Sequence, residues 1–236
     1  MIRGLKILVV SVFLTVFGNG VFGQISPGDI AIIMYSADGA DEISFVALAS
    51  IAAGEQINFT DNGWLATNDW RGGEGVDTYT VPAGGLACGD VVTVTLSSCA
   101  LSTSGDQVIA YQNTYDMLYG INNEGANVWQ ADATSSNTSA LPSGLTNGTT
   151  AVALTESDNA VYSGSTTGTK AQLLAWIGDY TNWTYDNTSS LTFSGTITVT
   201  DCGAATPLLA VNPSSITGLD YVFGSEEYPE WVGSSF

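Results

Sequence analysis

The sequence predicts an all-β protein that folds as an antiparallel β-sandwich with one short helix. Short runs of β-branched and aromatic residues recur along the chain, separated by clusters of Gly, Asn, Asp, Ser and Pro. Residues 44–48 and 196–200 alternate apolar and polar side chains with a period of two, which is typical of strands with one buried face. The 27 glycines and turn signals at intervals of about 8–12 residues favour a sandwich over a fold of alternating strands and helices.

The expected strands follow from these runs, taken in chain order. They cover residues 30–35, 43–48, 56–60, 78–81, 91–96, 107–112, 151–154 and 191–200. Only residues 169–177 have a helical spacing of apolar side chains, with Ala171, Leu174 and Ile177 on one face. The chain is therefore expected to form two packed sheets and a single helix.

The first 23 residues have the pattern of a signal peptide. Arg3 and Lys6 precede an apolar run at residues 7–17, which is shorter than the ~20 residues that span a bilayer. Small residues then lead to an expected cleavage site after Gly23, which predicts a secreted or cell-surface protein. Beyond it we expect a sandwich domain at 24–200, a linker at 201–210 and the incomplete start of a second β-module at 211–236, so that the chain is a piece of a longer protein.

The charge balance and the absence of histidine exclude several functions. A net charge of −19 repels nucleic acids and anionic membranes, and it attracts divalent cations, although acidity also keeps an exported protein soluble. The sequence contains no histidine, which excludes histidine-based triads and histidine-bound zinc. We expect no enzyme and no required cofactor. A hydrolase acting through paired carboxylates, such as Glu74 with Asp61 or Asp69, is the remaining catalytic alternative.

The chain has three cysteines, Cys88, Cys99 and Cys202. The expected strand at 91–96 carries the chain about 20 Å away from Cys88, and too few residues remain to bring Cys99 back. A disulfide needs Cα atoms within ~7 Å. We therefore expect a bridge from Cys202 to one of the other two.

An acidic turn is a candidate calcium site. Asp38, Asp41 and Glu42 lie in one turn between two expected strands, and Asp61 adds a carboxylate in a later loop. Ca²⁺ binds six to eight oxygen ligands, and flexible acidic loops suit it. The spacing does not match an EF-hand, and an Asp-Gly pair often marks only a hairpin turn, which is the alternative interpretation.

Tryptophans beside amides and carboxylates are candidates for a sugar-binding face. Trp70 and Trp183 directly follow Asp69 and Asn182, and Trp64 and Trp129 lie close behind asparagines. An exposed ring can stack on a sugar while polar neighbours orient it. The alternative is that the rings pack at the ends of the sandwich; we expect this for Trp64 and exposure for Trp70.

Two stretches resemble modules of bacterial surface proteins. Residues 28–112 are similar to a divergent lamin-tail-type domain, an immunoglobulin-like sandwich, through motifs at 28–32, 51–54, 60–64, 79–85 and 101–107. The same pattern, continuing through 139–142, 159–162 and 182–183, is similar to a family found at the N-termini of large secreted bacterial proteins. Residues 221–236 resemble the start of a choice-of-anchor L domain.

Both resemblances imply an extracellular architecture, and neither implies a reaction. The expected function is therefore that of a noncatalytic module with a structural, adhesive or binding role. Its expected partners are other domains of a longer surface protein, with a polysaccharide as the alternative.

Overall fold

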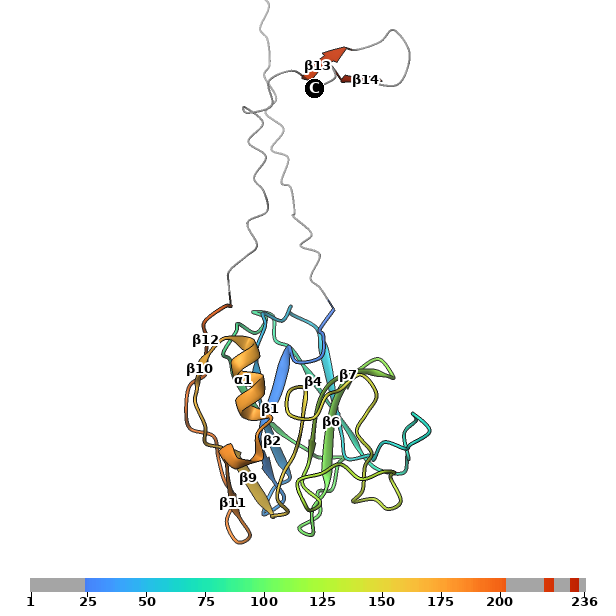
Figure 1. Cartoon of the computed structure of the whole chain (residues 1–236), viewed down its shortest axis with the longest axis vertical. Coiled ribbons are helices and arrows are strands. Elements are labelled where there is room, and N and C mark those ends of the chain that lie inside the picture. Colours follow the sequence, from blue (N-terminus) through green and yellow to red (C-terminus); the bar gives the residue numbers. More distant parts are fainter. Residues whose placement is uncertain (1–23, 203–218, 223–229, 234–236) are drawn as a thin grey trace, which may run out of the picture.

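A computed structural model describes residues 24–202 together with two short strands, 219–222 and 230–233. The predictions for residues 1–23, for the linker beyond residue 202 and for most of the second module lie outside the described residues. Residues 24–202 form a β-sandwich of two five-stranded sheets, which confirms the predicted fold class (Figure 1).

The first sheet has the strand order β11-β9-β1-β2-β5, and all of its pairs are antiparallel. Its strands are β1 (Ile30–Ser36), β2 (Glu42–Ala47), β5 (Val91–Thr95), β9 (Asn159–Tyr162) and β11 (Trp183–Asp186).

The second sheet has the order β4-β3-β6-β7-β8. Its strands are β3 (Gln56–Thr60), β4 (Val76–Thr80), β6 (Gln107–Gln112), β7 (Asp116–Asn122) and β8 (Ala151–Ala153). Strand β8 runs parallel to β7, so the sheet is mixed and departs from the purely antiparallel prediction.

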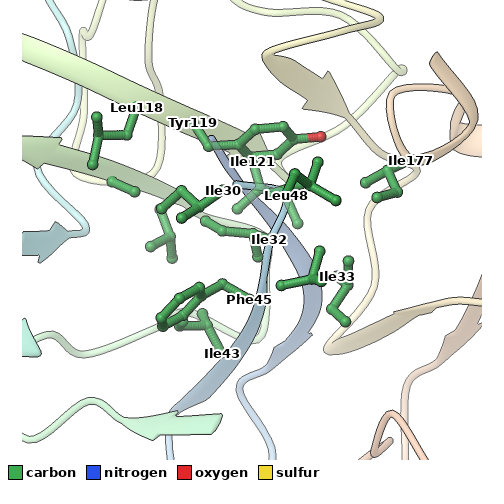
Figure 2. Close-up of a cluster of buried hydrophobic side chains, with 14 of the residues drawn as sticks. Ile30, Ile32, Ile33, Ile43, Phe45, Leu48, Leu118, Tyr119, Ile121 and Ile177 are labelled. Atoms are coloured by element: carbon green, nitrogen blue, oxygen red, sulfur yellow. The ribbon is translucent and has the colours of Figure 1, made fainter. Parts of the chain in front are cut away.

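Apolar side chains from both sheets fill the space between them. Phe45 of β2 packs against Phe59 of β3 and Tyr79 of β4, with ring centroids 5.5 Å apart in both pairs. Figure 2 shows the surrounding core, in which isoleucines of β1 and β2 meet Leu118, Tyr119 and Ile121 of β7. Burial of this apolar surface is the main favourable term in folding.

Strand β1 is buried on both faces because a helix covers the outside of the first sheet. Helix α1 (Lys170–Ile177) begins at Thr169, whose side chain forms a capping box with Gln172, as expected for a helix start. Its buried residues Leu173, Leu174 and Ile177 belong to the main core, and Figure 1 shows the helix lying along β1. The predicted helix at 169–177 is confirmed.

The outer face of the second sheet has a smaller apolar cluster of its own. It contains Trp64, Ile109, Met117, Ala140, Leu145 and Ala151, with Trp70, Tyr111, Trp129 and Leu141 partly buried around it. A register shift in the β6–β7 ladder pairs Ala110 with Tyr119 but Tyr111 with Met117. Because this bulge inserts one residue, Met117 faces the outer cluster while Tyr119 faces the main core.

Some elements differ from the sequence prediction. Strands β7, β9 and β11 were not predicted, and the expected strand at 191–200 is reduced to β12 (Thr198–Val199), which pairs in parallel with β10 (Thr167–Gly168). A short 3₁₀-helix, η1 (Tyr180–Asn182), precedes β11.

The end of the sandwich domain is held in two ways. Cys202 forms a disulfide with Cys88, and Asp201 accepts a hydrogen bond from the backbone N–H of Lys170 at 2.8 Å. Cys99 is free and buried, so the expected pairing of Cys202 with one of the other two cysteines is confirmed. Asp201 and Cys202, which fall in the expected linker at 201–210, are therefore attached to the sandwich.

Strands β13 (Leu219–Val222) and β14 (Glu230–Gly233) pair as an antiparallel hairpin, within the segment expected to begin a second β-module. In the part of the chain that the structure describes, no helix has the length and apolar character that crossing a membrane requires.

Candidate functional site

The four carboxylates of the expected calcium site have separate hydrogen-bonding roles. Asp38 accepts from the Asn159 side chain at 2.7 Å, and Glu42 accepts from the Thr95 hydroxyl at 3.0 Å. Asp41 and Asp61 each accept from a backbone N–H, of Leu101 and Ala100 respectively. Among the described residues, no three acidic, histidine or cysteine side chains are grouped to hold a metal ion. Calcium binding by these residues therefore stays a prediction.

Carboxylates instead hold the segment that crosses from one sheet to the other. The five consecutive backbone N–H groups of residues 98–102 all donate to carboxylates, contributed by Asp77, Asp61, Asp41 and Asp106. This crossing segment connects β5 of the first sheet to β6 of the second, and it has no strand partner for these donors. The carboxylates therefore supply the acceptors that a neighbouring strand would otherwise provide.

The environment moves the pKa values of these carboxyls in opposite directions. Burial raises the pKa of Asp106 to about 8, more than its two backbone hydrogen bonds lower it. Burial, and then the charge of Asp61, raises the pKa of Glu74 to about 7. Burial also opposes ionisation of Asp77, but the hydrogen bonds from Cys99, Ser98 and Ser97 outweigh it and lower its pKa to about 2.

Perturbed carboxyls can indicate a catalytic pair, but Asp106, whose pKa is raised most, is buried, while Glu74 and Asp77 are half-buried. Asp61 and Asp106 are each 3% exposed, and none of the three grooves described below is lined by them or by Glu74. The hydrogen bonds of Asp61 and Asp106 support a structural role for these two residues in holding the crossing segment.

The tryptophans divide between the core and the outer face. Trp183 is buried against Tyr162 and donates its indole N–H to the carbonyl of Ile177 at 2.8 Å, so its assignment to a sugar-binding face is wrong. Trp64 is buried, as predicted. The expectation of an exposed Trp70 is wrong in part, because the side chain is half-buried: it packs against Trp64 and Tyr111 and donates to the carbonyl of Thr114.

Trp129 is half-buried beside the same outer cluster and donates its N–H to Asn147 at 3.2 Å. Trp70 and Trp129 therefore lie on the outer face of the second sheet, whereas Trp183 belongs to the first sheet.

Replacing Trp183 with phenylalanine should lower the free energy of unfolding by about 1–2 kcal/mol. The variant keeps a ring in the core but leaves the Ile177 carbonyl without its donor. Urea unfolding monitored by circular dichroism checks this value. A loss below about 0.5 kcal/mol would show that the indole hydrogen bond does not contribute.

A groove lined by amide side chains opens on the second sheet at the end of β3 and β6. We call it the amide groove; its volume is about 570 Å³, and its lining residues are Gln24, Gly54, Glu55, Gln56, Asn58, Gln112 and Asn113. Ile57 and Phe59 of β3 point into the core, so the alternation of the strand directs Gln56 and Asn58 outward. The strand geometry therefore places two amides side by side on one face.

Local hydrogen bonds position these amides. Asn58 accepts from the Thr78 hydroxyl at 2.7 Å, which fixes the amide and leaves its N–H₂ group available. Gln112 donates to the Glu55 carboxylate and to the carbonyl of Gln56, both at 2.9 Å.

An aromatic pair stands next to the amides. Tyr111 is the cross-strand partner of Asn58, so both side chains lie on the same face of the sheet. The Trp70 ring packs on Tyr111 with centroids 4.9 Å apart. Half-exposed rings beside oriented amides are the combination by which proteins bind sugars, through stacking and hydrogen bonds to hydroxyl groups.

A second groove of about 340 Å³ adjoins the first and shares Gln24 with it. We call it the tyrosine groove, after the exposed Tyr115; its other lining residues are Ile25, Ser26, Pro27, Asp116, Met117, Ser143 and Gly144. A third groove of about 390 Å³ is lined by residues 50–53 and 83–87, whose mostly small side chains offer few groups to orient a ligand.

The amide groove was not predicted from the sequence. The available signal was the alternation in β3, where Gln56 and Asn58 flank Ile57, but a polar outward face is ordinary for a strand. Gln24, Gln112 and Asn113 join it only through the fold.

Comparison with known proteins identifies no relative: no family model, curated protein or solved structure matches the chain.

Proposed function

We propose that this chain is a noncatalytic extracellular β-sandwich module that binds a neutral carbohydrate through the amide groove. The observation that carries the proposal is the set of oriented amides next to the Tyr111–Trp70 pair. Export of the chain rests on the N-terminal sequence pattern, and membership of a larger surface protein rests on the resemblances described above.

The charge distribution supports a neutral ligand. No lysine or arginine lines the amide groove, and Glu55 contributes a negative charge to it. The two basic residues in the sandwich domain are engaged elsewhere, Arg71 beside Glu74 at 3.8 Å and Lys170 with Asp29. A phosphate-bearing, sulfated or uronate polymer would meet repulsion without a compensating cation.

A panel of insoluble polysaccharides tests the proposal. The neutral members are cellulose, xylan, mannan and chitin, and alginate is the anionic control. We expect retention on at least one neutral polymer, and at least tenfold weaker binding by the double variant Gln56→Ala/Asn58→Ala, because each lost hydrogen bond contributes about 0.5–1.5 kcal/mol.

The double variant should melt close to the wild-type temperature because both side chains point away from the core. Thr184→Ala, an exposed change on the first sheet, is the matched control and should bind normally. Retention on none of the neutral polymers, or unchanged binding by the double variant, would contradict the proposal.

A further inference from the structure

The amide groove and the tyrosine groove meet at Gln24, which lines both. Building on the proposed function, we propose that the two grooves form one extended site for several consecutive sugar residues of a neutral glycan, with Tyr115 as the stacking platform of the second subsite. In this arrangement Asp69 is a positioning residue that holds the Tyr115 ring.

Tyr115 combines exposure with a fixed orientation. The residue is 54% exposed, among the largest values for a big apolar side chain in the described domain. Its hydroxyl nevertheless donates to Asp69 Oδ1 at 3.0 Å, and its ring meets Trp64 edge to face with centroids 6.0 Å apart. A ring that is held at its hydroxyl and packed against Trp64, yet 54% exposed, offers surface to solvent without rotating freely, which reduces the entropy lost on binding.

Asp69 is well placed to hold this ring. The same Oδ1 atom also accepts from the backbone N–H of Trp70 at 2.8 Å. The Trp70 indole N–H reaches the carbonyl of Thr114, the neighbour of Tyr115, at 3.0 Å. The loop that contains Asp69 and Trp70 is therefore hydrogen-bonded to the β6–β7 turn at two points, the Tyr115 hydroxyl and the Thr114 carbonyl.

The turn itself brings the two grooves together. Asn113 has a positive φ of 50°, a conformation that asparagine tolerates, and this lets β6 turn tightly into β7. Its side-chain amide and that of Gln24 both donate to Asp116 Oδ2. Asn113 lines the amide groove, Asp116 lines the tyrosine groove and Gln24 lines both, so this hydrogen-bonded group forms a polar junction between them.

The character of the two grooves defines the ligand. Each is of modest size against the ~300–1,000 Å³ of ordinary small-molecule sites, and neither is lined by a basic side chain. Amides on one side of the junction and an open aromatic face on the other suit a polymer whose units carry both hydroxyl groups and apolar ring faces. An extended neutral glycan has this chemistry at every residue.

A chain-length series tests the extended site. Oligosaccharides from disaccharide to hexasaccharide are prepared from whichever neutral polysaccharide the domain retains, and their affinities are measured by calorimetry. For the wild type we expect affinity to rise at least tenfold from the shortest to the longest. Tyr115→Ala should lose this gain and bind the disaccharide like the wild type. Gln56→Ala/Asn58→Ala should weaken binding at every length.

Two further variants separate the platform from its support. Tyr115→Phe keeps the ring and loses the hydroxyl anchor, so it should bind the disaccharide like the wild type and lose part of the length-dependent gain, about two- to threefold. Asp69→Ala removes the acceptor of the same hydrogen bond and should behave in the same way. An unchanged gain in both variants would show that Asp69 does not position the ring. Wild-type length dependence in Tyr115→Ala, or an equal loss at all lengths, would overturn the two-subsite inference while leaving the proposed function in place. Failure of every neutral glycan to bind would overturn both. Melting temperatures confirm that the variants remain folded.

Discussion

The free energy of unfolding of this domain should fall by about 4 kcal/mol between pH 5 and pH 9 through Asp106 alone. Asp106 is 3% exposed, and burial raises its pKa to about 8, so the folded state keeps the carboxyl protonated where an unfolded chain releases the proton. Each tenfold difference in proton affinity is worth about 1.4 kcal/mol.

The sign follows from the number of protons bound. Between the pKa of an unfolded aspartate and about 8, the folded state holds more protons, so its stability decreases as the pH rises. Glu74, with a pKa raised to about 7, changes stability in the same direction. Asp77, with a pKa lowered to about 2, acts oppositely but only below about pH 4, outside this window.

Urea unfolding at a series of pH values measures this dependence. In Asp106→Asn, which cannot titrate, most of the slope should disappear, whatever the absolute stability of the variant. Asp90→Asn removes an exposed carboxylate and should retain the wild-type slope. Equal stability at pH 5 and pH 9 in the wild type would show that Asp106 is ionised in the folded domain.

Loss of the Cys88–Cys202 disulfide should lower the free energy of unfolding by about 4–5 kcal/mol. The bond joins residues 114 positions apart, and closing so long a loop restricts the unfolded chain strongly. Against a total of ~5–15 kcal/mol for an ordinary domain, this loss is a large fraction of the stability.

The comparison uses Cys88→Ala/Cys202→Ala and the wild type with and without reductant. The double variant and the reduced wild type should unfold at the same urea concentration, and reductant should have no further effect on the variant. Cys99→Ala keeps the disulfide and should still respond to reductant. A wild type that is indifferent to complete reduction would contradict the prediction.

The sequence predicted the sandwich because its central strands carry strong local signals. Strands β1 and β2 are rich in Ile and Val, and the helix has both its capping residue and its apolar spacing. Strand β7 was missed because Gly120 interrupts it; a Cβ there would lie 3.1 Å from the ring of Trp129, which the chain folds back over the strand. The requirement for glycine at position 120 becomes visible only when the outer cluster forms.

The candidate site was less predictable, because contacts that form only in the fold decide what its residues do. Trp70 has no apolar neighbour in sequence, yet Trp64 and Tyr111 pack against it across the turn and the sheet. Carboxylates in loops suit calcium, which is why the sequence favours Asp41 and Asp61 as cation ligands. In the fold Asp41 accepts from a backbone N–H 60 residues away, and Asp61 accepts from one 39 residues away. Local spacing carries no information about such partners.

The disulfide also determines how the domain transmits a mechanical load. The two ends of the segment 24–202 lie at the same end of the sandwich (Figure 1), and β12, just before Cys202, is held by a parallel ladder of two residue pairs. Tension applied at Cys202 would peel such a short ladder away easily. The bond to Cys88 instead carries the tension into the connection between β4 and β5, which belong to different sheets. Pulling should therefore load the sandwich directly, with β12 and helix α1 outside the force path.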